Sequence, residues 1–127
     1  MAYGIVQGIN ASPGITPSAI TGANNNYSPA GMVPYSTLWL DLSAAASLTG
    51  LAALPGDSEV TIVNISTTTA RIITLNNQNA GSTAENRFIL PNGLDWYIPN
   101  GGSATFKYNA AGSRWYLKNW TGNHFPV

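Results

Sequence analysis

Hydrophobic and polar residues alternate along most of the chain after residue 35. In residues 36–42 every second position from 38 onward is leucine, and the positions between are polar or aromatic. Alternation with a period of two is typical of a strand that buries one face. Further runs of alternating or β-branched residues occur at 59–65, 71–76, 87–90, 94–98, 103–108 and 113–119. The pattern therefore predicts six or seven short strands.

Turn residues separate these strands. Asn92-Gly93 is the pair that most readily supplies the two positive φ angles of a type I′ turn, so it predicts a hairpin of 87–90 with 94–98. Residues 109–112 predict a second hairpin, of 103–108 with 113–119. The four residues 66–69 predict another, joining 59–65 to 71–76.

Short strands at close spacing predict an all-β fold, specifically an antiparallel β-sandwich or barrel of jelly-roll-like character. Residues 43–54 are the one stretch that favours helix, because alanines are frequent and Ser43 or Ser47 could serve as an N-cap. Thr49 and Gly50 interrupt this stretch, so at most one or two helical turns are expected. At 127 residues a single core is expected, which we place in residues 36–127.

Residues 1–35 differ from the rest of the chain in being rich in glycine, proline and asparagine. Prolines lack an N–H group and glycines cost entropy to order, so we expect an extended N-terminal arm rather than a core segment. The arm carries too many apolar residues for a solvated linker. We expect it to dock on another subunit, and the alternative is that it folds back over its own domain as loops. Its expected interface residues are Tyr3, Ile5, Ile9, Tyr27 and Tyr35.

Charge is scarce. Only 8% of residues are charged and the net charge is zero, which favours association over mutual repulsion and suggests an assembly subunit. A low-charge surface suited to an extracellular setting is the alternative. Without a cluster of lysine and arginine, contact with nucleic acid is not expected. No apolar run or signal sequence points to a membrane, and synthesis in the cytoplasm is expected.

Reactive groups are also scarce. There is no cysteine, and the single histidine is His124, three residues before the last residue. Asp57 and Glu59 would point the same way on a strand, but they flank a turn where solvated carboxylates are ordinary. We therefore expect no enzyme activity, no metal site and no cofactor.

Several short motifs follow one another in a recognisable order, and together they resemble a β-module of tailed-bacteriophage virion proteins. The resemblance covers roughly residues 36–119, and the proteins that carry the module include capsid decoration proteins, head fibres and tail-fibre segments. The motifs are residues 48–51 (LTGL), 55–57 (PGD), 60–65 with Asn64, 72–75, 82–88 (STAENRF), 91–93 (PNG), 104–108 (ATFKY) and Arg114-Trp115.

The resemblance implies a phage virion structural protein. Because 127 residues offer no long shaft, we expect a capsid decoration, or cement, protein. It would bind the major capsid protein on the outer head surface as a homotrimer and stabilise contacts between capsomers. The alternative is a tail-fibre or baseplate-associated adhesin that binds host-surface glycans. A cell-wall hydrolase is a third possibility, which would require a carboxylate pair in a cleft.

Interface residues rather than an active site are expected to carry the function. For packing or trimer contacts these are Trp39, Trp96, Trp115, Arg87 and Arg114, and for an exposed tip they are Asn77, Gln78 and Asn79. We expect Arg87 to bond a buried acceptor that locks the loop ending at Asn86. Arg114 is expected to stack on Tyr116 or to pair with Asp95. Exposed aromatic rings beside asparagines would suit sugars, although large rings more often fill cores and interfaces.

Overall fold

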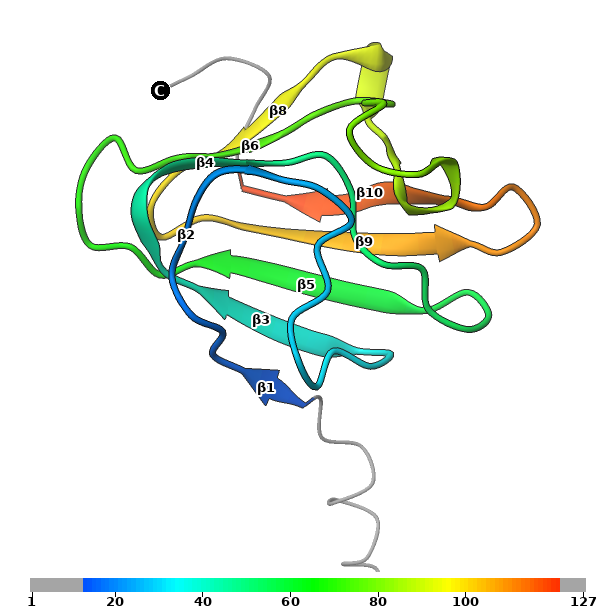
Figure 1. Cartoon of the computed structure of the whole chain (residues 1–127), viewed down its shortest axis with the longest axis horizontal. Helices are drawn as coiled ribbons and strands as arrows, with labels where there is room; N and C mark the ends of the chain where they lie inside the picture. The colour runs from blue at the N-terminus through cyan, green and yellow to red at the C-terminus, as the bar shows by residue number, and fades with distance from the viewer. Residues whose placement is uncertain (1–12, 122–127) are drawn as a thin grey trace, which may run out of the picture.

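Two β-sheets make up the fold in a computed structural model that describes residues 13–121 (Figure 1). The first sheet has the strand order β1-β3-β5-β9-β10-β7 and the second has the order β2-β4-β6-β8. The strands are β1 (Gly14–Ile15), β2 (Ile20–Asn24), β3 (Ser36–Leu40), β4 (Leu42–Leu48), β5 (Glu59–Asn64), β6 (Ile73–Leu75), β7 (Phe88–Ile89), β8 (Trp96–Ile98), β9 (Ser103–Asn109) and β10 (Arg114–Trp120). Two single 3-10 turns, η1 (Ala84–Asn86) and η2 (Pro91–Gly93), complete the elements. The all-β prediction is confirmed.

The N-terminal half of the described chain winds like a β-solenoid. After each strand the chain crosses to the opposite sheet, so β1, β3 and β5 enter the first sheet while β2, β4 and β6 enter the second. A strand that returns to the same sheet one coil later runs in the same direction, and all four pairs among these strands are parallel. The antiparallel jelly-roll-like arrangement is therefore wrong for this half.

The C-terminal half adds antiparallel strands to both sheets. β9 pairs antiparallel with β5 and with β10, and β8 pairs antiparallel with β6. The predicted hairpin of 103–108 with 113–119 is confirmed as β9 and β10, which lie side by side in Figure 1. β7 closes the first sheet by pairing parallel with β10.

The other two predicted hairpins are wrong. Asn92 and Gly93 do have positive φ angles, of 58° and 69°, as the Asn-Gly pair predicts. They connect β7 in the first sheet to β8 in the second, however, so they turn the chain between layers rather than within one. Residues 65–72 likewise connect β5 to β6 across the two layers.

The segment expected to be partly helical is strand β4. Its residues Leu42, Ala46 and Leu48 are buried, and it pairs in parallel with β2 on one side and β6 on the other. Hydrogen bonding to two neighbouring strands outweighs the weak helix propensity of the alanines, because propensity differences amount to only a few tenths of a kcal/mol per residue.

Residues 13–35 are part of the double-sheet fold, so the expectation of an arm lying outside it is wrong for them. β1 pairs with β3, β2 pairs with β4, and Ile20 is buried in the core. A parallel neighbour supplies the backbone partners that the glycines and prolines cannot supply locally. Tyr3, Ile5 and Ile9 lie outside the described residues.

The core fills the space between the two sheets. The first sheet contributes Leu38, Leu40, Val60, Ile62, Phe88, Ala104, Phe106, Tyr108 and Trp115, and the second contributes Ile20, Leu42, Ala46, Leu48, Ile73, Leu75 and Ile98. The rings of Phe88 and Phe106 stack with their centroids 4.8 Å apart. The predicted alternation is thus realised, with one face of each sheet turned to this core.

Candidate functional site

A polar cluster, here called the clamp, joins the first coils of the solenoid to the C-terminal half. It consists of residues 24–26, 49–50 and 82–87. The side-chain oxygen of Asn26 accepts three hydrogen bonds, from the Thr83 N–H (2.8 Å), the Thr83 hydroxyl (3.1 Å) and the Asn86 amide nitrogen (2.9 Å). Asn26 itself has a φ of 48°, a conformation that asparagine tolerates better than most residues. One asparagine therefore fixes a loop almost sixty residues away.

The centre of the clamp is a pair of buried hydroxyl groups. The Thr49 and Ser82 hydroxyl oxygens lie 2.7 Å apart, and the Thr49 hydroxyl also lies 2.7 Å from the Asn25 side-chain oxygen. The Asn26 N–H donates to the Ser82 hydroxyl at 2.8 Å. A side chain at Gly50 would not fit, because its Cβ would fall 2.2 Å from the Asn86 carbonyl oxygen.

Arg87 completes the clamp in the way that the sequence suggested. Its Nε donates to the carbonyl oxygen of Ser82, a buried residue, at 2.9 Å, and this bond closes the loop that ends at Asn86. The STAENRF motif, one of the set on which the resemblance to phage proteins rests, therefore has a structural role in this chain. The motif specifies how the loop folds and supplies no reactive group.

Arg114 makes neither of its expected contacts. Its Nε donates to the Gln78 side-chain oxygen at 2.8 Å. Asp95 is instead occupied by the Asn77 N–H at 2.8 Å and the Asn76 amide at 3.2 Å. The Asp95 carboxylate therefore bonds residues 76 and 77 at the end of β6 rather than Arg114.

The loop expected to form an exposed tip is only partly exposed. Asn77 is half-buried, and its side-chain oxygen accepts a hydrogen bond from the Leu90 N–H at 2.8 Å. Gln78 and Asn79 are exposed. The Asn79 side-chain oxygen accepts a hydrogen bond from the Gly81 N–H at 2.8 Å. The amides of this loop therefore serve mainly to fold it.

The three tryptophans singled out in the sequence have three different environments. Trp115 is fully buried, donates its indole N–H to the Leu51 carbonyl at 2.9 Å, and meets the ring of Tyr108 edge to face. Trp96 is half-buried and meets Trp120 edge to face. Trp39 is 41% exposed. Trp115 is thus a core residue, and Trp39 is available to a partner.

Trp39 belongs to the outer face of the first sheet, the side turned away from the core. This outer face is formed by Thr37, Trp39, Glu59, Thr61, Val63, Ser103, Thr105, Lys107 and Tyr116. The hydroxyls of Thr61 and Thr105, which are cross-strand neighbours, lie 2.9 Å apart. The indole Nε1 of Trp39 lies 3.2 Å from where a Cβ on Gly14 would be. The absence of a side chain at Gly14 therefore lets this ring lie close to β1.

The charged side chains of the outer face gather around one carboxylate, that of Glu59, which is paired with two lysines. Glu59 bonds Lys118 at 2.7 Å and lies 3.7 Å from the ammonium group of Lys107. The hydrogen bond from Lys118 lowers the pKa of Glu59, with the charges of both lysines acting in the same direction. The remaining outer face consists of hydroxyl groups, a valine and exposed aromatic rings, with Tyr116 42% exposed.

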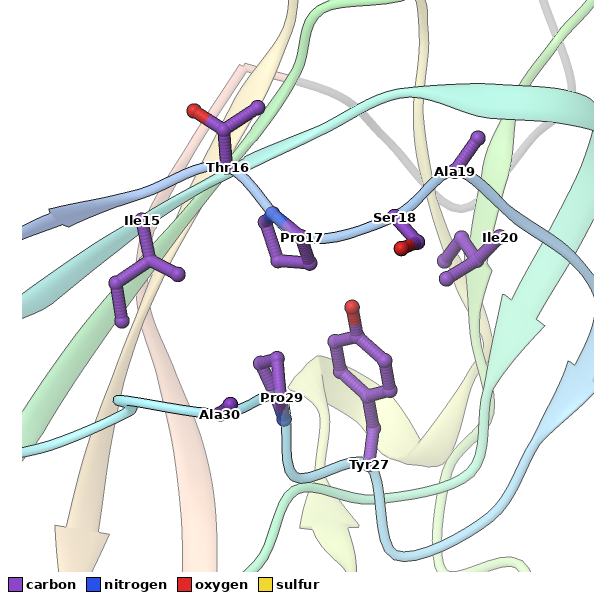
Figure 2. Close-up of a pocket in the computed structure, with 9 residues that line it drawn as sticks. All are labelled: Ile15, Thr16, Pro17, Ser18, Ala19, Ile20, Tyr27, Pro29 and Ala30. Atoms are coloured by element: carbon purple, nitrogen blue, oxygen red, sulfur yellow. The ribbon is translucent and has the colours of Figure 1, made fainter.

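A second surface feature is an apolar groove of about 520 Å³ in the first coil. One wall is residues 15–20, which connect β1 to β2, and the other is Tyr27, Pro29 and Ala30. Figure 2 shows the Tyr27 ring standing in the groove with its hydroxyl directed towards Pro17 and Ser18. Burial raises the pKa of this hydroxyl. The sequence did not reveal the groove, because its glycines and prolines made residues 13–35 resemble an extended arm rather than part of the fold.

The described residues hold few groups for catalysis. Within residues 13–121 no group of three or more histidine, cysteine, aspartate or glutamate side chains is placed to hold a metal ion. The Asp57 carboxylate accepts a hydrogen bond from the Ala110 N–H at 3.1 Å, and Glu59 is paired with lysines. His124 lies outside the described residues. In the same described range no helix is long and apolar enough to cross a membrane.

No protein-family model matches the chain, and no curated protein matches it.

Proposed function

We propose that this protein is a structural protein of a tailed-phage virion, and specifically a capsid decoration protein that binds the outer head surface as a homotrimer. The phage setting rests on the motif order described above. The observation that favours a binding role is the outer face of the first sheet, where Trp39 and Tyr116 are exposed among threonines and lysines that are paired with Glu59. Such a face suits attachment to another protein.

The chemistry of this face matches that of protein interfaces. Interface cores are depleted in charge and enriched in tryptophan and tyrosine, which bury a large area while losing little side-chain entropy. Tyr35, which immediately precedes β3, is 56% exposed and extends the aromatic surface at one end. A homotrimer would present three copies of the face to the capsid, and multivalent attachment would convert weak single contacts into high avidity.

One observation favours host-glycan binding as a second candidate. The Trp39 ring lies close to the backbone of Gly14, and the threonine hydroxyls of the outer face lie on the same side of the sheet. A sugar ring could stack on the indole while its hydroxyls bond Thr37 or Thr61. This arrangement would be suited to an adhesin of a tail fibre or baseplate.

Binding to undecorated capsids of the source virion tests the first proposal. We expect the wild-type protein to bind as a trimer, and we expect Trp39→Ala and Tyr116→Ala each to weaken binding at least tenfold, as is usual for aromatic interface residues. Leu94→Ala is the matched control, because Leu94 is 43% exposed but lies outside the outer face. Equal loss for all three variants, or no binding by the wild type, would contradict the proposal. Binding to a glycan array that depends on Trp39 would favour the adhesin instead.

A further inference from the structure

Two of the three arginines in the chain are neighbours at one end of the first sheet. β7 and β10 run parallel with Trp115 beside Phe88, which places Arg114 beside Arg87 one position earlier. The Trp115 N–H donates to the Arg87 carbonyl at 3.0 Å, in agreement with this register. Like charges at facing positions of adjacent strands destabilise a sheet, and a bound anion would relieve this repulsion.

Both arginines bond the same loop. The Nε of Arg87 donates to the Ser82 carbonyl at 2.9 Å, and the Nε of Arg114 donates to the Gln78 side-chain oxygen at 2.8 Å. The loop turns tightly between these two contacts, because the Ser82 N–H donates to the Asn79 carbonyl at 3.2 Å. The two guanidinium groups are therefore held against one short turn from adjacent strands.

The guanidinium groups keep donors that no group within residues 13–121 occupies. Both ion pairs in this range join a lysine to Glu59, so neither arginine is paired with a carboxylate there. Arg114 uses Nη1 to bond the Ser113 carbonyl at 3.0 Å, which leaves Nη2, and Arg87 has both Nη1 and Nη2 left. No buried side-chain nitrogen in the same range lacks a hydrogen bond, so these nitrogens contact solvent. Arg87 can thus bond a carboxylate in two places, and Arg114 can add a third donor.

The surroundings of the two arginines suit a sugar. Tyr116 follows Arg114 by two positions in β10, so the two side chains lie on the same face of the strand. The Tyr116 ring is 42% exposed and offers a flat surface on which a sugar ring can stack. Gln78 and Asn79 are exposed beside the arginines and carry amide nitrogens that can donate to sugar hydroxyls. An acidic sugar brings a carboxylate, a ring face and hydroxyl groups together, which an acidic peptide does not.

We propose that Arg87 and Arg114 bind the carboxylate of an acidic saccharide whose ring lies against Tyr116. This site differs from the sugar contact considered for Trp39, where the hydroxyls would bond threonines and no charge on the sugar is needed. The proposal does not rest on attachment to a capsid. Its test uses the isolated protein and the arginines, whereas the capsid test depends on Trp39, so either proposal can fail without the other.

Titration of the isotope-labelled full-length protein with trigalacturonate, followed by NMR, tests the site. We expect the amide signals of Arg114 and Tyr116 to shift, and we expect the uncharged methyl ester of the same trisaccharide to bind about tenfold more weakly. Arg114→Gln should weaken the binding of trigalacturonate about tenfold, because it removes a charge-assisted hydrogen bond. Lys118→Gln is the matched control, since it removes the same charge from the same strand, and it should bind as the wild type does.

Arg87→Lys separates the paired bonds from the charge. Lysine keeps the positive charge but cannot bond a carboxylate in two places, so we expect binding about tenfold weaker than that of the wild type. Equal binding of the acid and its ester, or equal losses for Arg114→Gln and Lys118→Gln, would overturn the proposal. Tighter binding of hexaglutamate than of trigalacturonate would assign the site to protein carboxylates and would overturn it as well.

Discussion

Asn26 offers the sharpest test of the clamp, because one side-chain oxygen accepts all three hydrogen bonds that tie the first coil to residues 83–86. We expect Asn26→Gly to remove these bonds while leaving the backbone free to keep its φ of 48°. Asn26→Ala should remove the same bonds and also strain the backbone. Asn26→Asp keeps the accepting oxygen and should stay close to the wild type.

The expected loss in free energy of unfolding follows from these hydrogen bonds. A hydrogen bond between neutral groups contributes about 1 kcal/mol net, and less where water can replace it. Thr83 is exposed and Asn86 is half-buried, so three bonds give a loss of about 2 kcal/mol for Asn26→Gly. A residue with a Cβ in the left-handed region costs about 1 kcal/mol more, which gives a loss of about 3 kcal/mol for Asn26→Ala.

Chemical denaturation, with the midpoint and slope fitted for each variant, measures these free energies of unfolding. Thermal melting provides a check, with an expected fall of about 4 °C per kcal/mol for a domain of this size. Asn100→Gly is the matched control, because Asn100 is exposed in the β8–β9 turn and should change stability by less than about 0.5 kcal/mol. If Asn26→Gly were as stable as this control, the clamp would not couple the two halves of the fold.

Three further substitutions test other parts of the structure. Gly50→Ala should lower the free energy of unfolding by at least about 3 kcal/mol, because the new Cβ would meet a backbone carbonyl at 2.2 Å. Gly56→Ala, where φ is 62° and the space is open, is the control and should lower it by about 1 kcal/mol. Similar losses for the two variants would contradict the close approach at Gly50. Trp115→Phe should lower the free energy of unfolding in denaturant by about 3 kcal/mol, since it leaves a void and an unpaired Leu51 carbonyl. A loss below about 1 kcal/mol would show that the core closes around the smaller ring. The pKa of Glu59 in the folded protein lies below its ordinary value of 4.5, so its contribution to stability is present above pH 4.5 and is lost as the pH falls through the folded-state pKa. Glu59→Gln should therefore lose less stability than the wild type below pH 4.5. The difference should be under about 1 kcal/mol, because the partner lysines are exposed. If the stability of the two proteins fell equally with pH, this ion pair would have no stabilising role.

Some features of the fold depend on neighbouring residues and could be predicted from the sequence. Leu38 and Leu40 lie on the buried face of β3 as the alternation predicts, and the Asn92-Gly93 pair has the positive φ angles that these residue types favour. The predicted strand 36–42 ends at Leu40, however, because the chain crosses at Asp41 and Leu42 begins β4 in the second sheet. The bond from Arg87 to the loop that ends at Asn86 spans only five residues. In each case the chain segment itself restricts the conformations that are open to it.

The sequence by itself determined that the protein is all-β, where most of its strands lie, and that Trp115 belongs with the core or an interface. Only the tertiary structure decided which strands are neighbours. Local pattern cannot distinguish a turn that reverses the chain within a sheet from one that carries it to the opposite sheet, because both use the same residues and bury the same faces. The pairing of β1 with β3 and of β2 with β4 depends on contacts about 23 residues apart. For the same reason the sequence of residues 13–35 predicts an arm, because nothing within this segment shows that parallel neighbouring strands bond its backbone.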